Sequence, residues 1–311
     1  MALLCQGCRD TELEKGEIRR FKAHELYTFQ VTCSPDGGGV ASCGFDGLIR
    51  AWDPKDWAEI QALAGHQSAV REVAYAPDGK RLVSCGLDGS VRLWDLDTGR
   101  QVRQLEGHEG PVYSVDVSPD GRRALSGGAD RTVTLWDLDS GSQAARFSGG
   151  YWEVGDVFSV RFSPDGEKVL VGCEDKSIRV LEGPTLKQSL RLEGLGVAAM
   201  SASFSPDSKA ILGSGSGKSI LLWDLSTGEE IRRFEGHVGT IRSVAFSADG
   251  ARIVSGSFDR TIRVWDTGSG LELARYDNHG DAVYSVTFSP DGRTILSGSY
   301  DGTLSVWSAP N

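Results

Sequence analysis

Long apolar runs and basic charge are both scarce in this sequence. No apolar run approaches the roughly 18 residues of a membrane span, and the N-terminal MALLCQGCRD turns polar before it could form the apolar core of a secretion signal. With 33 Lys and Arg against 43 Asp and Glu, the formal net charge is −10. A protein that follows nucleic-acid phosphates or an anionic membrane needs a basic surface, so we expect neither partner. These absences predict a cytoplasmic protein.

Cysteine is also scarce, with 6 residues in 311. This is too few for a disulfide framework in a chain of this length. Cys5 and Cys8 form one C-x-x-C pair without the second pair that a structural zinc site requires. We therefore expect no metal and no other cofactor, and favour an inert tail there over a redox or intermolecular role. The other four lie in apolar or strand-like runs and are expected to be small buried residues: Cys33, Cys43, Cys85 and Cys173.

The 5 His residues and most of the 8 Trp residues recur at a fixed period. Each His lies 28 residues before a Trp of the series, and a Pro-Asp turn lies 17 residues before the Trp position in six of seven units. The Trp residues recur in steps of 42, with one gap of 87 that spans a missing member at Leu181 and three inserted residues: Trp52, Trp94, Trp136, Trp223, Trp265 and Trp307.

Each unit contains four short strand-like segments separated by turns. In the second unit the strands are VREVAYAP, RLVSCG, SVRLWDL and RQVRQL, and the turns are PDGK, LDGS and DTG. No segment has the length and the 3.6-residue period of a helix. Three turns in each unit also account for the 40 Gly residues. The repeats therefore predict one large all-β domain rather than two ordinary domains.

The motifs G-H, S-P-D-G, D-G-T and W-D at this spacing, over residues 17–308, resemble the WD-repeat (Trp-Asp repeat) β-propeller family. The resemblance implies an all-β, seven-bladed β-propeller with four antiparallel strands per blade around a central channel. The segment EIRRF occurs at 17–21 and again at 230–234, but the first copy has no blade of its own, and the last unit is one strand short. We expect a flexible tail over 1–16 and a single propeller over 17–311, with a strand at 17–22 completing the last blade. The similarity of the units suggests recent duplication, which the resemblance associates with bacterial members.

The resemblance also implies a structural role for the repeated polar residues. In WD repeats a His, a Ser, an Asp and a Trp form a hydrogen-bonded tetrad that satisfies buried polar groups. We favour this role over Ser-His-Asp catalysis, and predict no catalytic residues and no enzyme activity. The fourth unit has Val171 and Leu181 at the Ser and Trp positions, and the fifth has Leu195, Gly213 and Gly217 at the His, Ser and Asp positions. The complete sets are His24, Ser42, Asp46 and Trp52; His66, Ser84, Asp88 and Trp94; His108, Ser126, Asp130 and Trp136; His237, Ser255, Asp259 and Trp265; and His279, Ser297, Asp301 and Trp307.

Three positions in each unit are expected to face the channel mouth on the top face, which in this family carries the segments between blades and the turns between second and third strands. Eight of the 11 Phe and 7 Tyr residues fall at these positions. Aromatic and Arg side chains are typical anchors of protein interfaces. Packing over the channel core is the alternative, and it is strongest for Phe45 and Phe258. The predicted binding residues are Phe29, Arg71, Tyr113, Phe158, Met200, Arg242, Tyr284, Tyr27, Phe45, Phe258 and Tyr300.

The fourth unit carries its three inserted residues in GGYWEVGDV, residues 149–157, where other units have Gly-His. The Trp in this segment lies outside the periodic series, so it either contacts a partner or covers the weakened fourth blade. Acidic residues nearby predict a negative rim suited to a basic or Arg-containing segment. The predicted residues are Tyr151, Trp152, Glu153, Asp156 and Glu174.

These patterns together predict a non-catalytic scaffold, monomeric as an isolated domain, that binds a protein or peptide at its top face. The alternative is a propeller that binds a small ligand, or a hydrolase or lyase that uses carboxylates at the channel mouth.

Overall fold

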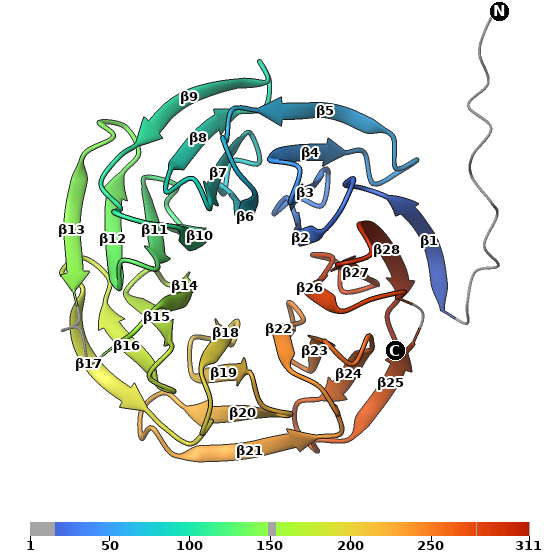
Figure 1. Ribbon diagram of the computed structural model, residues 1–311. Helices are drawn as coiled ribbons and strands as arrows, with labels where there is room; N and C mark the ends of the chain where they lie inside the picture. The colour runs from blue at the N-terminus through green and yellow to red at the C-terminus, as the bar shows by residue number, and fades with distance from the viewer. Residues whose placement is uncertain (1–15, 149–153, 278, 311) are drawn as a thin grey trace, which may run out of the picture.

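The computed structural model describes residues 16–148, 154–277 and 279–310, and these form seven four-stranded antiparallel sheets arranged as a ring (Figure 1). The predicted fold class is confirmed. In blades 1 to 6 the four strands follow one another in the chain, from the innermost strand at the channel to the outermost strand. No helix within the described ranges is long and apolar enough to cross a membrane.

The first four blades run from β2 to β17. Blade 1 contains β2 (Thr28–Cys33), β3 (Val40–Gly44), β4 (Leu48–Trp52) and β5 (Glu59–Ala64). Blade 2 contains β6 (Val70–Tyr75), β7 (Arg81–Gly86), β8 (Val91–Asp95) and β9 (Arg100–Leu105). Blade 3 contains β10 (Val112–Val117), β11 (Arg123–Gly128), β12 (Thr132–Asp137) and β13 (Gln143–Ser148). Blade 4 contains β14 (Val157–Phe162), β15 (Lys168–Cys173), β16 (Ile178–Glu182) and β17 (Lys187–Leu192).

The last three blades complete the ring. Blade 5 contains β18 (Ala199–Phe204), β19 (Ala210–Gly215), β20 (Ser219–Asp224) and β21 (Glu230–Glu235). Blade 6 contains β22 (Ile241–Phe246), β23 (Arg252–Ser257), β24 (Ile262–Asp266) and β25 (Glu272–Tyr276). Blade 7 contains β26 (Val283–Phe288), β27 (Thr294–Ser299) and β28 (Thr303–Ser308), and its fourth strand is β1 (Glu17–Lys22).

The ring is closed by the two ends of the chain, as the duplicated EIRRF segment predicts. Strand β1 pairs antiparallel with β28, with Glu17 opposite Trp307 and Lys22 opposite Thr303. Figure 1 shows β1 lying outside β28 at the junction with blade 1. Phe21 of β1 also packs edge-on against Trp52 of blade 1, with ring centroids 4.9 Å apart. The closing strand therefore links the first and last blades without a covalent bond and covers an exposed sheet edge.

The hydrophobic core lies between neighbouring sheets. Trp136 of blade 3, for example, belongs to the same buried cluster as Leu93 and Leu105 of blade 2. Cys43, Cys85 and Cys173 are buried as expected, whereas Cys33 is only partly buried at the end of β2. Each repeated Trp is thus a shared core residue, so the blades stabilise one another.

The top face is the end of the ring where the innermost strands begin. In blade 1, Thr28 lies opposite Gly44, and the Phe45 amide donates to the Tyr27 carbonyl at 3.0 Å. The start of the first strand and the turn after the second strand therefore meet at one edge, as the sequence predicts for the top-face positions. The Pro-Asp turns lie at the opposite edge, where Trp57 packs against Phe21 with ring centroids 6.0 Å apart.

Candidate binding face and channel mouth

The predicted tetrad residues form hydrogen-bonded chains in five blades. In blade 2, the Trp94 indole donates to Ser84 Oγ at 2.8 Å. An indole N–H can only donate, so Ser84 Oγ is the acceptor in that bond, and the Ser84 hydroxyl donates its own proton to His66 Nε2 at 2.8 Å. The other ring nitrogen, His66 Nδ1, then carries the proton and donates to Asp88 at 3.0 Å. Burial lowers the pKa of His66, whereas Asp88 acts in the opposite direction. The net lowering favours the neutral imidazole, which this series of hydrogen bonds requires.

The same geometry recurs in all five complete sets. The Trp–Ser distances are 2.7–2.9 Å, the His–Ser distances 2.6–2.9 Å and the His–Asp distances 2.8–3.3 Å. Each tetrad joins the segment before a blade to its second strand, second turn and third strand. The tetrads therefore fix the top-face loops on the blades, and they place their polar groups inside the protein rather than at a surface where a substrate could bind.

The two blades without complete tetrads have substitutes for these contacts. In blade 4, Asp175 pairs with Arg179 at 2.7 Å, and Val171 and Leu181 belong to a buried apolar cluster. In blade 5, a Cβ atom at Gly213 would lie 2.3 Å from Ile178 Cδ1. The neighbouring blade thus occupies the space that a Ser side chain would need.

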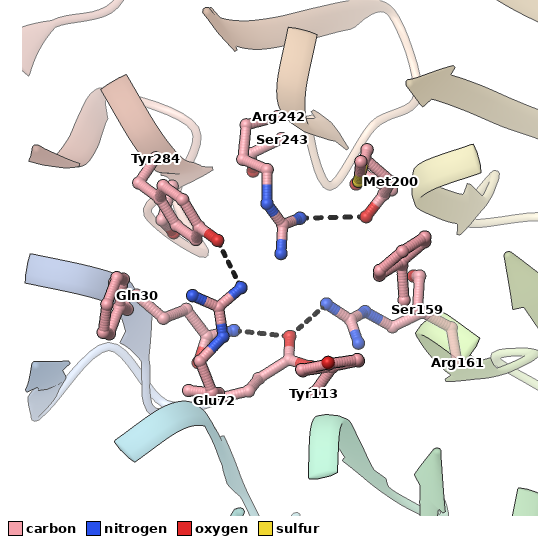
Figure 2. Close-up of a pocket in the computed structure, with 14 residues that line it drawn as sticks. Gln30, Glu72, Tyr113, Ser159, Arg161, Met200, Arg242, Ser243 and Tyr284 are labelled. Carbon is pink, nitrogen blue, oxygen red and sulfur yellow. Dashed lines mark hydrogen bonds and ion pairs between the residues drawn. The ribbon is translucent and has the colours of Figure 1, made fainter. Parts of the chain in front are cut away.

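A ring of side chains surrounds the mouth of the central channel. Each blade contributes the second residue of its innermost strand to this ring. The seven residues line one small cavity of about 40 Å³, which Figure 2 shows in close-up. These are the seven equivalent positions that the resemblance to WD repeats places at the mouth, namely Phe29, Arg71, Tyr113, Phe158, Met200, Arg242 and Tyr284. The structure therefore brings together side chains that are up to 255 positions apart in the chain.

Six of the predicted aromatic residues form one continuous aromatic cluster across blades 1, 6 and 7. Its shortest contacts are Tyr27–Tyr300 at 4.5 Å, Tyr284–Tyr300 at 5.0 Å and Phe29–Tyr284 at 5.1 Å between ring centroids. The cluster consists of Tyr27, Phe29, Phe45, Phe258, Tyr284 and Tyr300. Its inner part, Phe29 and Tyr284, is buried.

The outer part of the aromatic cluster is exposed. Phe45 is 45% exposed and Phe258 is 42% exposed. The expectation that core packing is strongest for these two residues is therefore wrong, because each lies at the tip of a second turn and projects beyond the edge of the sheet. Leu26, two residues after His24, and Val238, directly after His237, are also exposed. These side chains add apolar surface to the top face.

Two arginines of the chain itself stack on the inner rings. The Arg71 guanidinium lies 4.6 Å from the centroid of Phe29 and 4.8 Å from that of Tyr284, and the Arg242 guanidinium lies 4.5 Å from that of Tyr284. Burial would raise the pKa of the Tyr284 hydroxyl, but the charges of Arg242 and Arg71 lower it to about 8. The inner rings Phe29 and Tyr284 therefore have cationic partners within the protein, whereas the most exposed rings of the cluster are those of Phe45 and Phe258.

The acidic side of the mouth lies at blades 3 and 4. Tyr113 and Phe158 stack with ring centroids 5.7 Å apart. Next to them the Asp156 amide donates to Glu174 at 3.1 Å, and burial together with the charge of Glu174 raises the pKa of Asp156. The other residues predicted for this rim lie outside the described residues, so their role as partner contacts stays a prediction: Tyr151, Trp152 and Glu153.

Sequence reasoning missed a second ring directly below the mouth. In each blade, the residue after the mouth position accepts a hydrogen bond from a main-chain amide of the next blade, at 2.6–3.3 Å. The members of this inter-blade ring are Gln30, Glu72, Ser114, Ser159, Ser201, Ser243 and Ser285. The available signal was a small polar residue in the middle of each innermost strand, Ser in five of seven units.

The two long members of the inter-blade ring extend into the channel. Glu72 accepts hydrogen bonds from Val115 N at 3.0 Å, from Gln30 Nε2 at 2.9 Å and from the Arg161 guanidinium at 2.5 Å (Figure 2). Below this group, a lower cavity of about 250 Å³ is lined by Gln30, Glu72, Asp116 and Arg161 among others. Within the described ranges, no group of three or more His, Cys, Asp or Glu residues is placed to hold a metal ion.

The blades, the closed ring and the five tetrads define a seven-bladed propeller built from Trp-Asp repeats. The profile of the family described as WD domain, G-beta repeat, matches the chain seven times, and the chain belongs to this WD40 family. The matched residues are 15–53, 57–95, 99–137, 144–181, 188–224, 228–266 and 270–308. A search of curated proteins finds no matching relative. Members of this family generally act as scaffolds for protein interactions.

Proposed function

We propose that this protein is a non-catalytic scaffold that binds a partner protein or peptide on its top face. The observation that supports this best is the exposed part of the aromatic cluster, where Phe45 and Phe258 lie in turns on the top face, which also exposes Leu26 and Val238. Aromatic side chains carried by a rigid frame bind a partner with little loss of conformational freedom. The tetrads and the inter-blade ring provide that frame.

We further propose that the partner presents a basic or Arg-containing segment. Glu174 lies close enough to Asp156 to disfavour the charge of the Asp156 carboxylate, as the raised pKa of Asp156 indicates, and a cation between them would relieve this repulsion. Glu25 and Asp281 are exposed beside the aromatic cluster. A guanidinium from a partner could stack on the open face of Phe45 or Phe258 while it pairs with these carboxylates.

The alternative, a propeller that binds a small ligand or catalyses hydrolysis or elimination, would depend on carboxylates in the channel. The best residue for this role is Asp116, because burial raises its pKa to about 6 despite the charge of Arg161. Asp116, however, accepts the Phe162 amide at 2.8 Å, and Glu72 is bound by three donors. These structural contacts favour the scaffold. A cytoplasmic location and a monomeric state remain predictions from the sequence.

The test compares proteins captured from a native extract by three forms of the full chain. We expect the wild type and Ile60→Ala to recover the same partners, because Ile60 is 60% exposed on the outermost strand of blade 1 and far from the top face. We expect the double variant Phe45→Ala and Phe258→Ala to lose them while circular dichroism shows an unchanged fold. Equal recovery by all three forms would rule out the aromatic cluster as the binding site.

A further inference from the structure

The channel mouth is positively charged although the whole chain is acidic. The net charge of the sequence is −10, yet the cavity at the mouth is lined by three arginines and one carboxylate, namely Arg71, Arg161, Arg242 and Glu72. Figure 2 shows Arg161 and Arg242 directed toward the centre of the channel from different blades, with the Glu72 carboxylate joined to Arg161 and Gln30. The sign of the charge therefore reverses between the edge of the top face and its centre.

The one carboxylate is already engaged. Glu72 pairs with Arg161 at 2.5 Å and accepts two further hydrogen bonds from Gln30 and Val115. Within the described part of the chain, neither Arg71 nor Arg242 forms an ion pair with a carboxylate. Their positive charges therefore have no carboxylate counter-charge in direct contact.

The hydrogen-bond partners of both arginines are neutral groups. Arg71 donates to the Tyr284 hydroxyl, and its Nε is buried without a hydrogen-bond partner. Arg242 donates from one terminal nitrogen to the Met200 carbonyl at 2.9 Å and also interacts with the Tyr284 hydroxyl. Stacking on aromatic rings offsets part of the loss of hydration of a buried guanidinium, but it does not neutralise its charge. The lowered pKa of Tyr284 supports this reading, because the charges of Arg71 and Arg242 favour a negative charge on the Tyr284 oxygen beside them.

We infer that the channel mouth binds an oxyanion, a carboxylate or phosphate group, between Arg71 and Arg242. Guanidinium groups recognise such anions through charge-assisted hydrogen bonds. The cavity of about 40 Å³ has room for a small group of this kind, since one water needs about 10–15 Å³ measured in this way, but it has no room for an aromatic ring.

This site goes beyond the proposed binding of a basic segment and has two possible sources of anion. One is a free small anion. The other is a Glu or phosphorylated side chain carried by a partner, which would make the recognised segment one of mixed charge, with basic residues at the edge of the face and one acidic group at its centre. The chemistry at the site is the same in both cases.

The test is calorimetric titration of the full chain with sodium acetate, sodium phosphate and the capped peptides Gly-Glu-Gly and Gly-Gln-Gly, at constant ionic strength set with chloride. We expect saturable binding of at least one free anion or of the Glu peptide, and none of the Gln peptide. Arg242→Gln should weaken this binding at least tenfold. Arg252→Gln is the matched control, because Arg252 stacks on Phe288 at 5.4 Å and bonds the Gly292 carbonyl away from the mouth.

A second measurement needs no variant. Because an anion beside Arg71 and Arg242 would compete with the tyrosinate form of Tyr284, the bound anion should raise the pKa of Tyr284 from about 8, followed by ultraviolet absorbance. Binding of a free anion without binding of the Glu peptide favours a small-molecule site, and binding of the Glu peptide alone identifies a partner side chain. The inference is wrong if none of the ligands binds saturably, or if Arg242→Gln binds them as the wild type does. Neither result bears on the capture experiment, which uses the aromatic cluster.

Discussion

Replacement of Glu72 by Ala should destabilise the protein more than any single change in the serines of the inter-blade ring. Its carboxylate holds Arg161, whose side chain is 30% exposed while that of Glu72 is 10% exposed. It also accepts the Val115 amide at 3.0 Å and Gln30 Nε2 at 2.9 Å. Breaking a buried pair costs roughly 3–5 kcal/mol and each orphaned buried donor about 1–3 kcal/mol. Since Arg161 is partly hydrated and the channel can relax, we expect a loss of about 3–4 kcal/mol.

The assay is equilibrium unfolding in urea at pH 7, followed by tryptophan fluorescence. Glu72→Gln keeps an acceptor for Val115 but removes the charge, and should lose about 2 kcal/mol. Ser243→Ala removes the 3.2 Å bond from the Val286 amide and the 3.4 Å bond to the Val286 carbonyl, and should lose about 1 kcal/mol. The reasoning is refuted if Glu72→Ala and Ser243→Ala have equal free energies of unfolding, because the charge network across the channel would then contribute nothing.

Three further predictions concern the tetrads and the closure of the ring. Ser84→Ala should lower the free energy of unfolding by about 2–4 kcal/mol in the same urea assay, because it removes the partner of both Trp94 and His66; a loss below 1 kcal/mol would contradict a buried tetrad. Because burial lowers the pKa of His66 in the folded state, His66 binds a proton more readily in the unfolded state when the pH falls below the ordinary histidine pKa of about 6.5. The free energy of unfolding should therefore fall from pH 7 to pH 5, and less steeply in His66→Gln. Phe234→Ala, at a site 1% exposed, should lose about 3–5 kcal/mol. The partly buried equivalent Phe21→Ala should lose about 1–2 kcal/mol in thermal and urea unfolding, and no loss would argue against closure by β1.

The period of the sequence, together with the resemblance to WD repeats, was enough to predict the architecture, because in a propeller each repeat makes the same contacts with its neighbours. The steps of 42 located the blades, and the unpaired EIRRF at 17–21 located the closing strand. The same period identified the mouth positions, since residues at one register of equivalent strands must lie at one depth in the channel. The repeat pattern therefore indicated which positions share the channel mouth.

The orientation of those side chains could not be predicted from the period. Arg71 and Tyr284 are 213 positions apart, and their contact depends on the sizes of the neighbours that share the channel. Phe45 and Phe258 were hard to place for a similar reason, since exposure at a turn tip depends on how far the turn projects. The inter-blade ring was overlooked because serine in a strand gives no sign of whether its hydroxyl crosses to another sheet.

The measurement that tests the central claim most directly is the dissociation constant of a recovered partner for the wild type, for Phe45→Ala with Phe258→Ala, and for Ile60→Ala. Truncation of an interface anchor typically costs about 2 kcal/mol or more, which is about a thirtyfold change in affinity. We predict at least this loss for the double variant and no change for Ile60→Ala. Equal affinity for all three forms would contradict the claim that the top face of the propeller, through its exposed aromatic side chains, is the binding surface.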